Sequence, residues 1–350
     1  MELAQIVNPL LEWYGQNKRD LPWRKDQDSY HVWISEIMLQ QTRVEAVKEY
    51  YLRFMKRLPT IYDLAEVDED ELLKLWQGLG YYNRARNLKK TAQIVVEKYN
   101  GKLPDKFLEL IKLPGIGNYT AGAIASICFE EKVPAVDGNV LRVLARVLNS
   151  EKNIDLLETK KGCTELLQRI LPEEIGDFNQ ALMELGALVC LPNGFPECEI
   201  CPLQKLCKAY QNGTQMELPK RLSKKERKKE DRTILIFLCQ DKISVIKRPD
   251  KGLLANLYEF PNIDSKLSLE EVKKYCKYKK IDVEHIFELG EAKHIFTHIE
   301  WHMKGYMIEI SDFFANCEWI SYTDLKERYS LPSAFKFYES KLLGHLNSMG

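Results

Sequence analysis

The sequence predicts a multidomain protein in which an all-α N-terminal region is followed by an α+β C-terminal domain. Three observations support this fold class. Apolar residues recur at helical spacing through residues 1–212, and no convincing strand pattern interrupts them. Residues 217–232 are highly charged and nearly free of apolar side chains, which is typical of a linker. After this linker, short apolar segments rich in β-branched residues are typical of strands.

The composition limits the functions that the chain can have. Its 350 residues are enough for two or three domains, each with a core of its own. Lysine plus arginine and aspartate plus glutamate both number 51, so a DNA-binding surface would have to be locally basic. No apolar run is long enough to span a membrane, and the N-terminus does not resemble a signal peptide. We therefore expect a cytoplasmic, nucleoid-associated protein with no membrane partner.

The first helix is predicted at residues 1–15, and the segment 19–24 that follows it contains Trp23 and Arg24. An exposed tryptophan beside an arginine can stack on a nucleobase. A tryptophan in the hydrophobic core is the more common case, and the segment alone favours it.

Glu36 lies among apolar residues within residues 30–55, which are predicted to be helical. A carboxylate in such surroundings would be partly desolvated, and desolvation raises its pKa toward the range of a general acid. On the pattern alone, a glutamate that faces water is the simpler interpretation. The uncharged segment Leu39–Thr42 comes next, and its polar side chains either reach into a duplex or form an ordinary helix surface.

Two glycines followed by two tyrosines mark residues 78–82. An aromatic side chain on a turn can act as a wedge in a base stack, and Tyr81 is the candidate. An aromatic turn that packs on its own core would give the same pattern.

Residues 107–147 predict a helix, a tight turn, a second helix, a short loop and a third helix. Pro114 discourages continuation of the first helix, and Gly115 and Gly117 let the backbone turn and approach another group closely. Exposed N–H groups ahead of a helix N-terminus can bind an anion such as a DNA phosphate. A plain helical hairpin remains the alternative. Asp137 then opens the third helix, where an N-cap role is the simplest interpretation.

A further helix at residues 174–188 places Gln180 and Glu184 on one face and leads directly into a group of four cysteines. These are Cys190, Cys198, Cys201 and Cys207. Clustered cysteines in a cytosolic chain indicate a metal site rather than disulfides. Structural zinc and a [4Fe–4S] cluster both accept four thiolates. Only one Cys-x-x-Cys pair is present, so spacing favours iron–sulfur only slightly.

The C-terminal domain is predicted to contain strands and helices in an α+β arrangement. The expected strands are residues 233–239, 243–248 and 303–310, and the expected helices are residues 268–277 and 333–347. Two motifs stand out here. One is Gly-Leu-Leu-Ala-Asn-Leu-Tyr-Glu-Phe-Pro at residues 252–261, and the other is Phe296-Thr297-His298.

These motifs together resemble the MutY-type adenine DNA glycosylases of the helix-hairpin-helix glycosylase superfamily. Leu-Pro-Gly-Ile-Gly-Asn-Tyr-Thr-Ala at residues 113–121, followed by Asp137, matches the superfamily hairpin and its essential aspartate. Endonuclease III-like members have a nucleophilic lysine where this chain has Tyr119. Residues 252–261 resemble the Gly-Leu-Leu-Ala-Gly-Leu-Trp-Glu-Phe-Pro signature of the family's Nudix-like domain, with departures at Asn256 and Tyr258. No glutamate-rich Nudix helix is present, so pyrophosphate hydrolysis is not expected.

The resemblance implies a domain organisation. A six-helix domain of about residues 22–130 would be inserted in an iron–sulfur domain of about residues 1–21 and 131–212. A linker at residues 213–232 and a Nudix-like domain at residues 233–350 would follow.

The resemblance also implies the reaction, which is hydrolysis of the N-glycosidic bond of adenine mispaired with 8-oxoguanine or guanine in duplex DNA. The adenine would be flipped out of the helix, protonated at N7 by Glu36, and released while Asp137 stabilises the oxocarbenium-like sugar. The cofactor implied is a [4Fe–4S] cluster, although the first cysteine gap is seven residues where the family usually has six. We expect the enzyme to act as a monomer.

The site residues implied by the resemblance form five groups. The catalytic residues are Glu36, Asp137, Tyr119 and Asn139, and the adenine pocket comprises Trp23, Arg24, Leu39 and Gln180. The DNA-binding residues are Gln41, Thr42, Tyr81, Gly115 and Gly117. The 8-oxoguanine contacts are Phe296, Thr297 and His298, and the cluster ligands are Cys190, Cys198, Cys201 and Cys207.

Two other functions remain open at this point. One is an endonuclease III-like glycosylase and lyase for oxidised pyrimidines, against which Tyr119 and the C-terminal domain count. The other is a non-catalytic mismatch-binding protein, against which the presence of both Glu36 and Asp137 counts.

Overall fold

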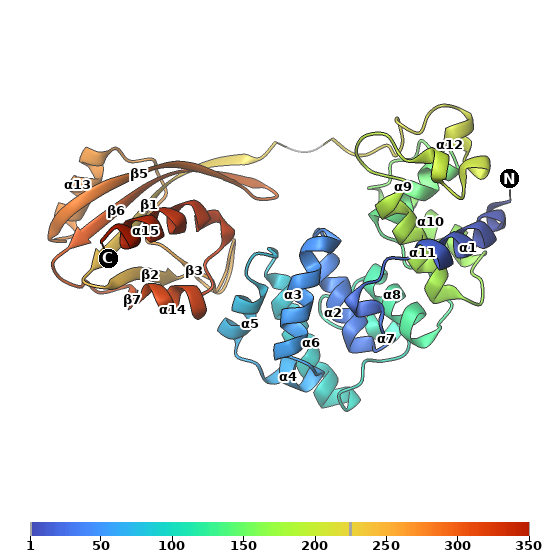
Figure 1. Cartoon of the computed structure of the whole chain (residues 1–350), viewed down its shortest axis with the longest axis horizontal. Coiled ribbons are helices and arrows are strands. Elements are labelled where there is room, and N and C mark those ends of the chain that lie inside the picture. Colours follow the sequence, from blue (N-terminus) through green and yellow to red (C-terminus); the bar gives the residue numbers. More distant parts are fainter. Residues whose placement is uncertain (1, 224–225, 350) are drawn as a thin grey trace. The chain divides into compact units, whose positions relative to one another are not determined.

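A computed structural model describes residues 2–223 and 226–349, and it divides into two compact units (Figure 1). The first unit consists of Met1–Val67 and Asn87–Ser223, and the second of Asp68–Arg86 and Lys224–Gly350. The segment Asp68–Arg86 therefore groups with the C-terminal residues, whereas the predicted six-helix domain of about residues 22–130 included it. No helix in the described part of the chain combines the length and the apolar character needed to cross a membrane.

The first unit is helical, and its described residues contain no strand, as predicted. Residues 30–55 form two helices instead of one, because the backbone of Gln41 between them has a left-handed φ of 59°. The elements are η1 (Leu3–Ile6), α1 (Val7–Asn17), η2 (Pro22–Arg24), α2 (Ser29–Leu39), α3 (Val44–Arg57), α4 (Ile61–Glu66), α6 (Asn83–Tyr99, which begins in the second unit), α7 (Phe107–Leu110), α8 (Asn118–Phe129), α9 (Gly138–Val147), α10 (Leu157–Gln168), α11 (Ile175–Leu188), η3 (Cys198–Ile200), η4 (Gln204–Leu206) and α12 (Lys208–Gln211).

A hydrophobic core joins the N-terminal helix to elements far along the chain. Apolar residues of α1 are buried with those of α9 and α11, including Leu10, Val143 and Phe178. Close approach of these helices requires glycine, since a Cβ on Gly186 of α11 would lie 2.6 Å from the Cβ of Asn139. This packing places the start of α9 against the last turn of α11.

The predicted hairpin is formed by α7 and α8. Gly115 has a φ of 76°, in the region that glycine adopts readily, and a Cβ there would lie 2.7 Å from the Cβ of Asn87. Gly117 is the N-cap residue of α8 and has an ordinary extended backbone with open space beside it. The turn therefore requires a glycine at the first position for conformation, while the second leaves the start of α8 uncovered.

The second unit contains a seven-stranded mixed sheet in the order β3-β2-β1-β6-β5, with β4 paired to β1 and β7 paired to β2. The pairing of β1 with β6 is parallel, and the other pairings are antiparallel. The elements are α5 (Glu69–Trp76), β1 (Lys228–Cys239), β2 (Lys242–Lys247), β3 (Tyr258–Glu259), β4 (Asn262–Ile263), α13 (Leu269–Tyr278), β5 (Val283–Ile295), β6 (Ile299–Ile310), β7 (Glu318–Ile320), α14 (Tyr322–Glu327), η5 (Ser333–Phe335) and α15 (Lys336–Met349).

Helices cover both faces of this sheet (Figure 1). Strand β6 shows why, because its side chains alternate between the faces. Tyr306 and Ile308 pack with Val272 and Cys276 of α13, whereas Met303 and Met307 pack with the η5–α15 segment. Each face of the strand therefore contributes to a different core.

The linker is shorter than the predicted range of residues 213–232. Its first part is bonded to the first unit, where Arg146 Nε donates to the Leu218 carbonyl at 3.0 Å and the Leu222 N–H donates to Asp155 at 3.0 Å. Its last part belongs to β1, which starts at Lys228 and not at residue 233. Charged side chains do not prevent this, because residues 228–232 pair through their backbone with β6.

Candidate active site

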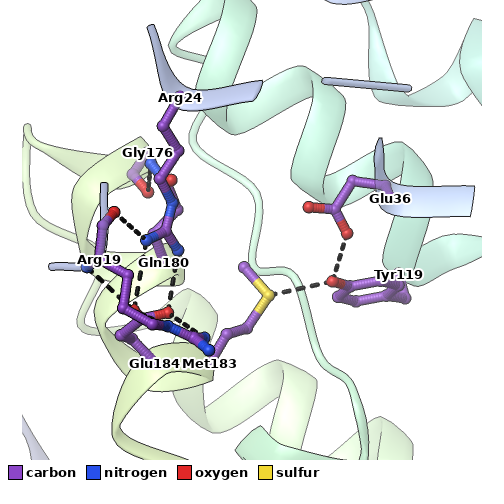
Figure 2. A network of polar contacts seen from close by, with 8 residues as sticks. All are labelled: Arg19, Arg24, Glu36, Tyr119, Gly176, Gln180, Met183 and Glu184. Atoms are coloured by element: carbon purple, nitrogen blue, oxygen red, sulfur yellow. Dashed lines mark hydrogen bonds and ion pairs between the residues drawn. The ribbon is translucent and has the colours of Figure 1, made fainter. Parts of the chain in front are cut away.

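The centre of the candidate site is a contact between Glu36 and Tyr119 (Figure 2). Glu36 lies in α2 and is only 7% exposed, so the interpretation that it faces water was wrong. The Tyr119 hydroxyl, at the start of α8, donates a hydrogen bond of 2.5 Å to Glu36 Oε2. It also lies 3.1 Å from the sulfur of Met183 on α11. Three helices therefore enclose one carboxyl group.

The surroundings of Glu36 change its proton affinity. Burial raises its pKa from 4.5 to about 7, while the hydrogen bond from Tyr119 opposes this rise. The negative charge of Asp137 raises the pKa of Glu36 further, so the two carboxylates interact electrostatically. A carboxyl group with a pKa near neutrality is suited to donate a proton at physiological pH.

Asp137 caps the N-terminus of α9, as its local pattern predicted. One carboxylate oxygen accepts from the Val140 N–H at 2.8 Å, and the other accepts from Asn139 Nδ2 at 2.8 Å. Burial raises the pKa of Asp137, and the backbone and side-chain hydrogen bonds at the helix start oppose this. The cap therefore holds a buried carboxylate in a fixed orientation and favours its charged form.

A chain of hydrogen bonds extends from Asp137 toward the cysteines. Asn139 bonds Asp137 through its amide nitrogen and accepts from Arg142 Nη2 at 2.8 Å through its oxygen. Arg142 Nε in turn donates to the carbonyl of Cys190 at 2.8 Å. Arg142 was not predicted as a site residue, because an arginine on the buried face of α9 interrupts the apolar pattern of that helix.

A second buried carboxylate, Glu184, lies on α11 near this centre (Figure 2). Its oxygens accept from Arg19 Nε at 2.6 Å and from Arg24 Nη2 at 3.0 Å. Burial opposes ionisation of Glu184, but the hydrogen bonds from Arg19 and Arg24 lower its pKa to about 2. In the sequence, Glu184 could be connected with the site only because it shares a helix face with Gln180. No sequence pattern identified Arg19 as its partner.

The predicted adenine-pocket residues lie in different environments. Trp23 is 5% exposed and packs edge-on against Tyr51, with ring centroids 5.3 Å apart, so the core interpretation is confirmed. Leu39 is the last residue of α2 and is half-buried. Figure 2 places Arg24 and Gln180 beside Glu184, and Gln180 donates to the Gly176 carbonyl at 3.3 Å. Arg24 and Gln180 supply the polar groups of the predicted adenine pocket.

The predicted wedge residues share an unusual backbone. Gln41 in the first unit and Tyr81 in the second are both exposed and have left-handed φ values of 59° and 48°. Residues other than glycine rarely adopt this conformation, and it is concentrated at functional sites. Thr42 is half-buried, and its hydroxyl donates to the Gln40 carbonyl at 3.4 Å.

The four cysteines line one small cavity together with Val143 and Arg146 of α9. Arg146 Nη1 lies 3.2 Å from the sulfur of Cys190. Burial raises the pKa of Cys201 to about 12, so a thiolate there requires a compensating positive charge, which a metal centre would provide. No group of three His, Cys, Asp or Glu side chains in the described residues is arranged to hold a single metal ion. The thiol donor set fits an iron–sulfur cluster chemically.

Phe296, Thr297 and His298 form the turn between β5 and β6. Phe296 packs edge-on against Trp301, with ring centroids 4.8 Å apart, whereas Thr297 and His298 are exposed. The Thr297 hydroxyl lies 3.0 Å from the Tyr81 hydroxyl within the second unit. A predicted wedge residue and a predicted lesion contact are thus brought together by the fold.

Comparisons with known proteins match both parts of the chain. Residues 34–173 match the family model of the HhH-GPD superfamily base excision DNA repair protein, and residues 232–338 match that of the NUDIX domain. A solved non-covalent endonuclease III–DNA complex contains a chain with 26% identity and a TM-score of 0.52, covering 61% of this chain and 100% of that one. These matches define a helix-hairpin-helix DNA glycosylase with a Nudix-like C-terminal domain.

Similarity to individual proteins extends over most of the sequence. The adenine DNA glycosylase of Mus musculus is 35% identical, with 98% of this chain and 79% of that protein covered. The adenine DNA glycosylase of Buchnera aphidicola subsp. Schizaphis graminum is 38% identical, with 88% of each covered. This chain therefore belongs to the adenine DNA glycosylase family and is a base-excision repair enzyme. The expectation of an enzyme of this family is confirmed, and neither the lyase nor the non-catalytic alternative is retained.

Proposed function

We propose that this glycosylase removes adenine mispaired with 8-oxoguanine or guanine in duplex DNA. The observation that carries the proposal is the buried pair of Glu36 and Tyr119, electrostatically coupled to the capped carboxylate of Asp137. Two carboxylates with different proton affinities are the general arrangement for breaking a glycosidic bond. We also expect the enzyme to act as a monomer on nucleoid DNA.

The target adenine first has to leave the duplex, because a stacked base cannot reach a carboxyl group buried among helices. Base flipping costs a few kcal/mol, and side chains that fill the vacated space offset part of that cost. Gln41 and Tyr81 are exposed on strained turns, which suits them to this role. The backbone N–H groups near Gly115 and Gly117 then hold the DNA backbone at the start of α8.

Glu36 supplies the proton that makes adenine a leaving group. With a pKa of about 7, a large fraction of Glu36 is protonated at neutral pH and can donate to N7. The bond between the sugar and N9 then breaks, and its electron pair leaves with neutral adenine. The Tyr119 hydroxyl donates to the carboxylate that remains on Glu36 and stabilises it. Water adds to the sugar, and Glu36 can accept the proton that this water loses.

Asp137 stabilises the positive charge that develops on the sugar. Its orientation is fixed before the reaction by the Val140 N–H and by Asn139, so little reorganisation is needed. Arg142 holds Asn139 in place from the other side. Asn139 therefore acts on the reaction through the position of Asp137.

Adenine is held by groups that complement its edge. Arg24 donates to Glu184, which holds its guanidinium in a fixed orientation, and Gln180 lies beside Glu184 on the same helix. Truncation of this network would loosen the pocket without removing the proton donor.

Cys190, Cys198, Cys201 and Cys207 would hold a [4Fe–4S] cluster. Such a cluster would cross-link four thiolates rigidly. It would not have to supply electrons, because the hydrolysis is not a redox reaction. Arg146 would donate to the ligand sulfur of Cys190. The seven-residue first gap lies in a loop that contains Pro192 and Gly194 and can accommodate the additional residue.

Thr297 would read the opposite base. An adenine pocket cannot distinguish a mispaired adenine from a normal one, so the discrimination has to come from the partner base. 8-Oxoguanine carries a donor at N7 that guanine lacks, and a hydroxyl group can accept from it. Such a contact gives about 1–3 kcal/mol of discrimination.

The proposal is tested by Asp137→Asn, which preserves the shape of the side chain and removes its charge. Single-turnover assays would use duplexes with adenine opposite 8-oxoguanine or guanine, followed by cleavage of abasic sites with hot alkali. We expect the variant to bind both duplexes but to excise at least about 100-fold more slowly. Asp155→Asn, at a carboxylate that contacts Leu222, is the matched control and should excise normally. Near-normal excision by Asp137→Asn would refute its assigned role.

A further inference from the structure

The two positions where this chain departs from the Nudix-like signature both contact α5. Asn256 Nδ2 donates to Glu69 Oε1 at 2.9 Å, and the Tyr258 hydroxyl lies 3.4 Å from Asp70 Oδ2. The family signature has glycine and tryptophan at these positions, where glycine has no side-chain donor and tryptophan carries an indole N–H in place of the tyrosine hydroxyl. Asn256 has a φ of 56°, a left-handed conformation that asparagine tolerates in place of glycine. Asn256 therefore adds a contact in a backbone conformation that glycine also adopts readily.

The contact with α5 also includes an ion pair between Lys247 and Asp70. Lys247 Nζ, at the end of β2, lies 2.7 and 2.8 Å from the two carboxylate oxygens of Asp70. Lys247 also lies over the ring of Tyr258, with 5.2 Å to the ring centroid. Arg86 joins the contact from the other end of the segment, where it donates to the Ala255 carbonyl and pairs with Glu69 at 3.3 Å.

The later part of α5 and its C-cap residue, Gln77, are bonded to backbone carbonyls of the C-terminal residues. Lys74 Nζ donates to the carbonyls of Leu325 and Tyr329 at 3.2 and 2.8 Å, and Gln77 Nε2 donates to Leu331 at 2.8 Å. All these residues belong to the second compact unit. The acidic start of α5 thus meets one lysine, and its later turns meet backbone groups.

We propose that α5 is the docking element for the C-terminal domain, and that the ion pair of Lys247 with Asp70 determines their alignment. This alignment holds the Thr297 hydroxyl beside Tyr81, at the 3.0 Å separation described above. Lys247 and Asp70 are therefore positioning residues for the choice between 8-oxoguanine and guanine. This inference rests on the proposed role of Thr297 in reading the opposite base.

The physical basis is the geometry of a hydrogen bond, which is lost when its partners move apart by about 1 Å. Within the second unit, contacts of the C-terminal residues with α5 fix the turn that carries Thr297 relative to Tyr81. The side chains of Lys247 and Asp70 are 40% and 37% exposed, and one such pair contributes little stability. The pair acts mainly through alignment. A negative charge in place of Lys247 would repel the acidic start of α5 and shift the two elements apart.

The test is a charge exchange between the two positions. Lys247→Glu and Asp70→Lys should each lower the ratio of single-turnover rates for adenine opposite 8-oxoguanine and opposite guanine by about tenfold. The rate opposite guanine should stay within about twofold of the wild-type rate, since neither residue belongs to the catalytic site. The double variant restores opposite charges, and its ratio should return to within about threefold of the wild-type value.

A matched control places the same change on a nearby loop. Lys251→Glu alters the charge between β2 and β3, and Lys251 has no side-chain hydrogen bond or ion pair within the described ranges. It should leave the ratio unchanged. If Lys247→Glu keeps the wild-type ratio, or if the double variant does not recover it, the docking inference is wrong. If the wild-type enzyme itself shows no preference for 8-oxoguanine, the proposed specificity fails instead.

A second measurement does not depend on the folding of any variant. A zero-length carbodiimide reagent converts a carboxylate and an amine in direct contact into an amide. In the wild-type protein without DNA, it should link Asp70 to Lys247, and digestion followed by mass spectrometry would identify the joined peptides. Cross-links from Asp70 to other lysines in place of Lys247 would contradict the alignment.

Discussion

Two buried carboxylates, Glu36 on α2 and Glu184 on α11, belong to the same candidate site, yet their pKa values are shifted in opposite directions. Glu36 has a pKa of about 7 because burial dominates and its hydrogen-bond partner, Tyr119, is neutral. Glu184 is also buried, but hydrogen bonds from Arg19 and Arg24 bring its pKa to about 2. Burial is thus common to both residues, and the charge of the partner decides which one can donate a proton.

This difference also gives the two residues opposite effects on stability. Between pH 4.5 and about 7 the folded state keeps a proton on Glu36 that the unfolded state has lost, so stability falls as pH rises. Glu184 behaves in the reverse way, and its contribution is present above pH 4.5 and is lost as pH falls toward 2. Glu36 is kept at a cost in stability, as expected for a functional group.

The largest effect is expected from Glu36→Gln, which removes the proton donor and keeps the shape. Excision should slow by about 100- to 10,000-fold, the range typical of a general acid. The variant should also be more stable than the wild type above pH 7, by up to about 3 kcal/mol, because no buried carboxylate has to be ionised. Single-turnover rates and thermal unfolding at pH 6 and pH 8 measure both effects.

The control for this variant is Glu45→Gln, which makes the same chemical change at an exposed residue of α3 that pairs with Lys48. It should excise at the wild-type rate and show no gain in stability at high pH. A Glu36→Gln enzyme that excises within a few-fold of the wild type would remove Glu36 from the mechanism.

The sequence located Glu36 but not its environment. Apolar neighbours on both sides of Glu36 allowed burial, and the resemblance assigned the role, yet periodicity alone favoured exposure. The deciding partner, Tyr119, lies 83 positions away in the chain, and its contact depends on how α2 and α8 pack. Asp137 was easier, because an N-cap is a local feature that the sequence of α9 already contains.

Long-range polar contacts were the least predictable part of the site. Arg19 and Glu184 are 165 positions apart, and no local pattern relates them. In the second unit, β5 was not predicted, because its mainly exposed or half-buried residues lack the apolar alternation of a core strand. The early start of β1 at Lys228 was missed for a related reason, since backbone pairing with β6 accommodates charged side chains.

The second prediction concerns Glu184→Gln, which removes the negative charge of the other buried carboxylate. The change leaves Arg19 and Arg24 without their shared counter-charge, and breaking a buried ion pair typically costs about 3–5 kcal/mol. We expect unfolding at a clearly lower temperature at pH 7. The difference from the wild type should shrink toward pH 2–3, where Glu184 becomes protonated. Thermal unfolding across this pH range measures both features.

Glu174→Gln provides the comparison for this variant, because it alters an exposed glutamate at the start of the same helix. Its unfolding temperature should match that of the wild type at every pH. A stability difference for Glu184→Gln that does not vary with pH would indicate lost packing instead of a lost charge interaction.

The smallest effect is expected from Tyr119→Phe, which removes the neutral donor that restrains the pKa of Glu36. The hydrogen bond from Tyr119 lowers that pKa, so its loss should raise it further and keep Glu36 protonated to higher pH. The excision rate should fall only about 2- to 10-fold at pH 7, because the carboxylate formed during the reaction loses one hydrogen bond with a net contribution of about 0.5–1.5 kcal/mol. The decline of the rate on the alkaline side should move upward by up to about one pH unit.

Met183→Leu removes the other contact of the hydroxyl and should leave this decline in place. A decline that moved to lower pH in Tyr119→Phe would mean that the tyrosine stabilises the protonated form of Glu36, and the contrast with the arginine-bound Glu184 would then need another explanation.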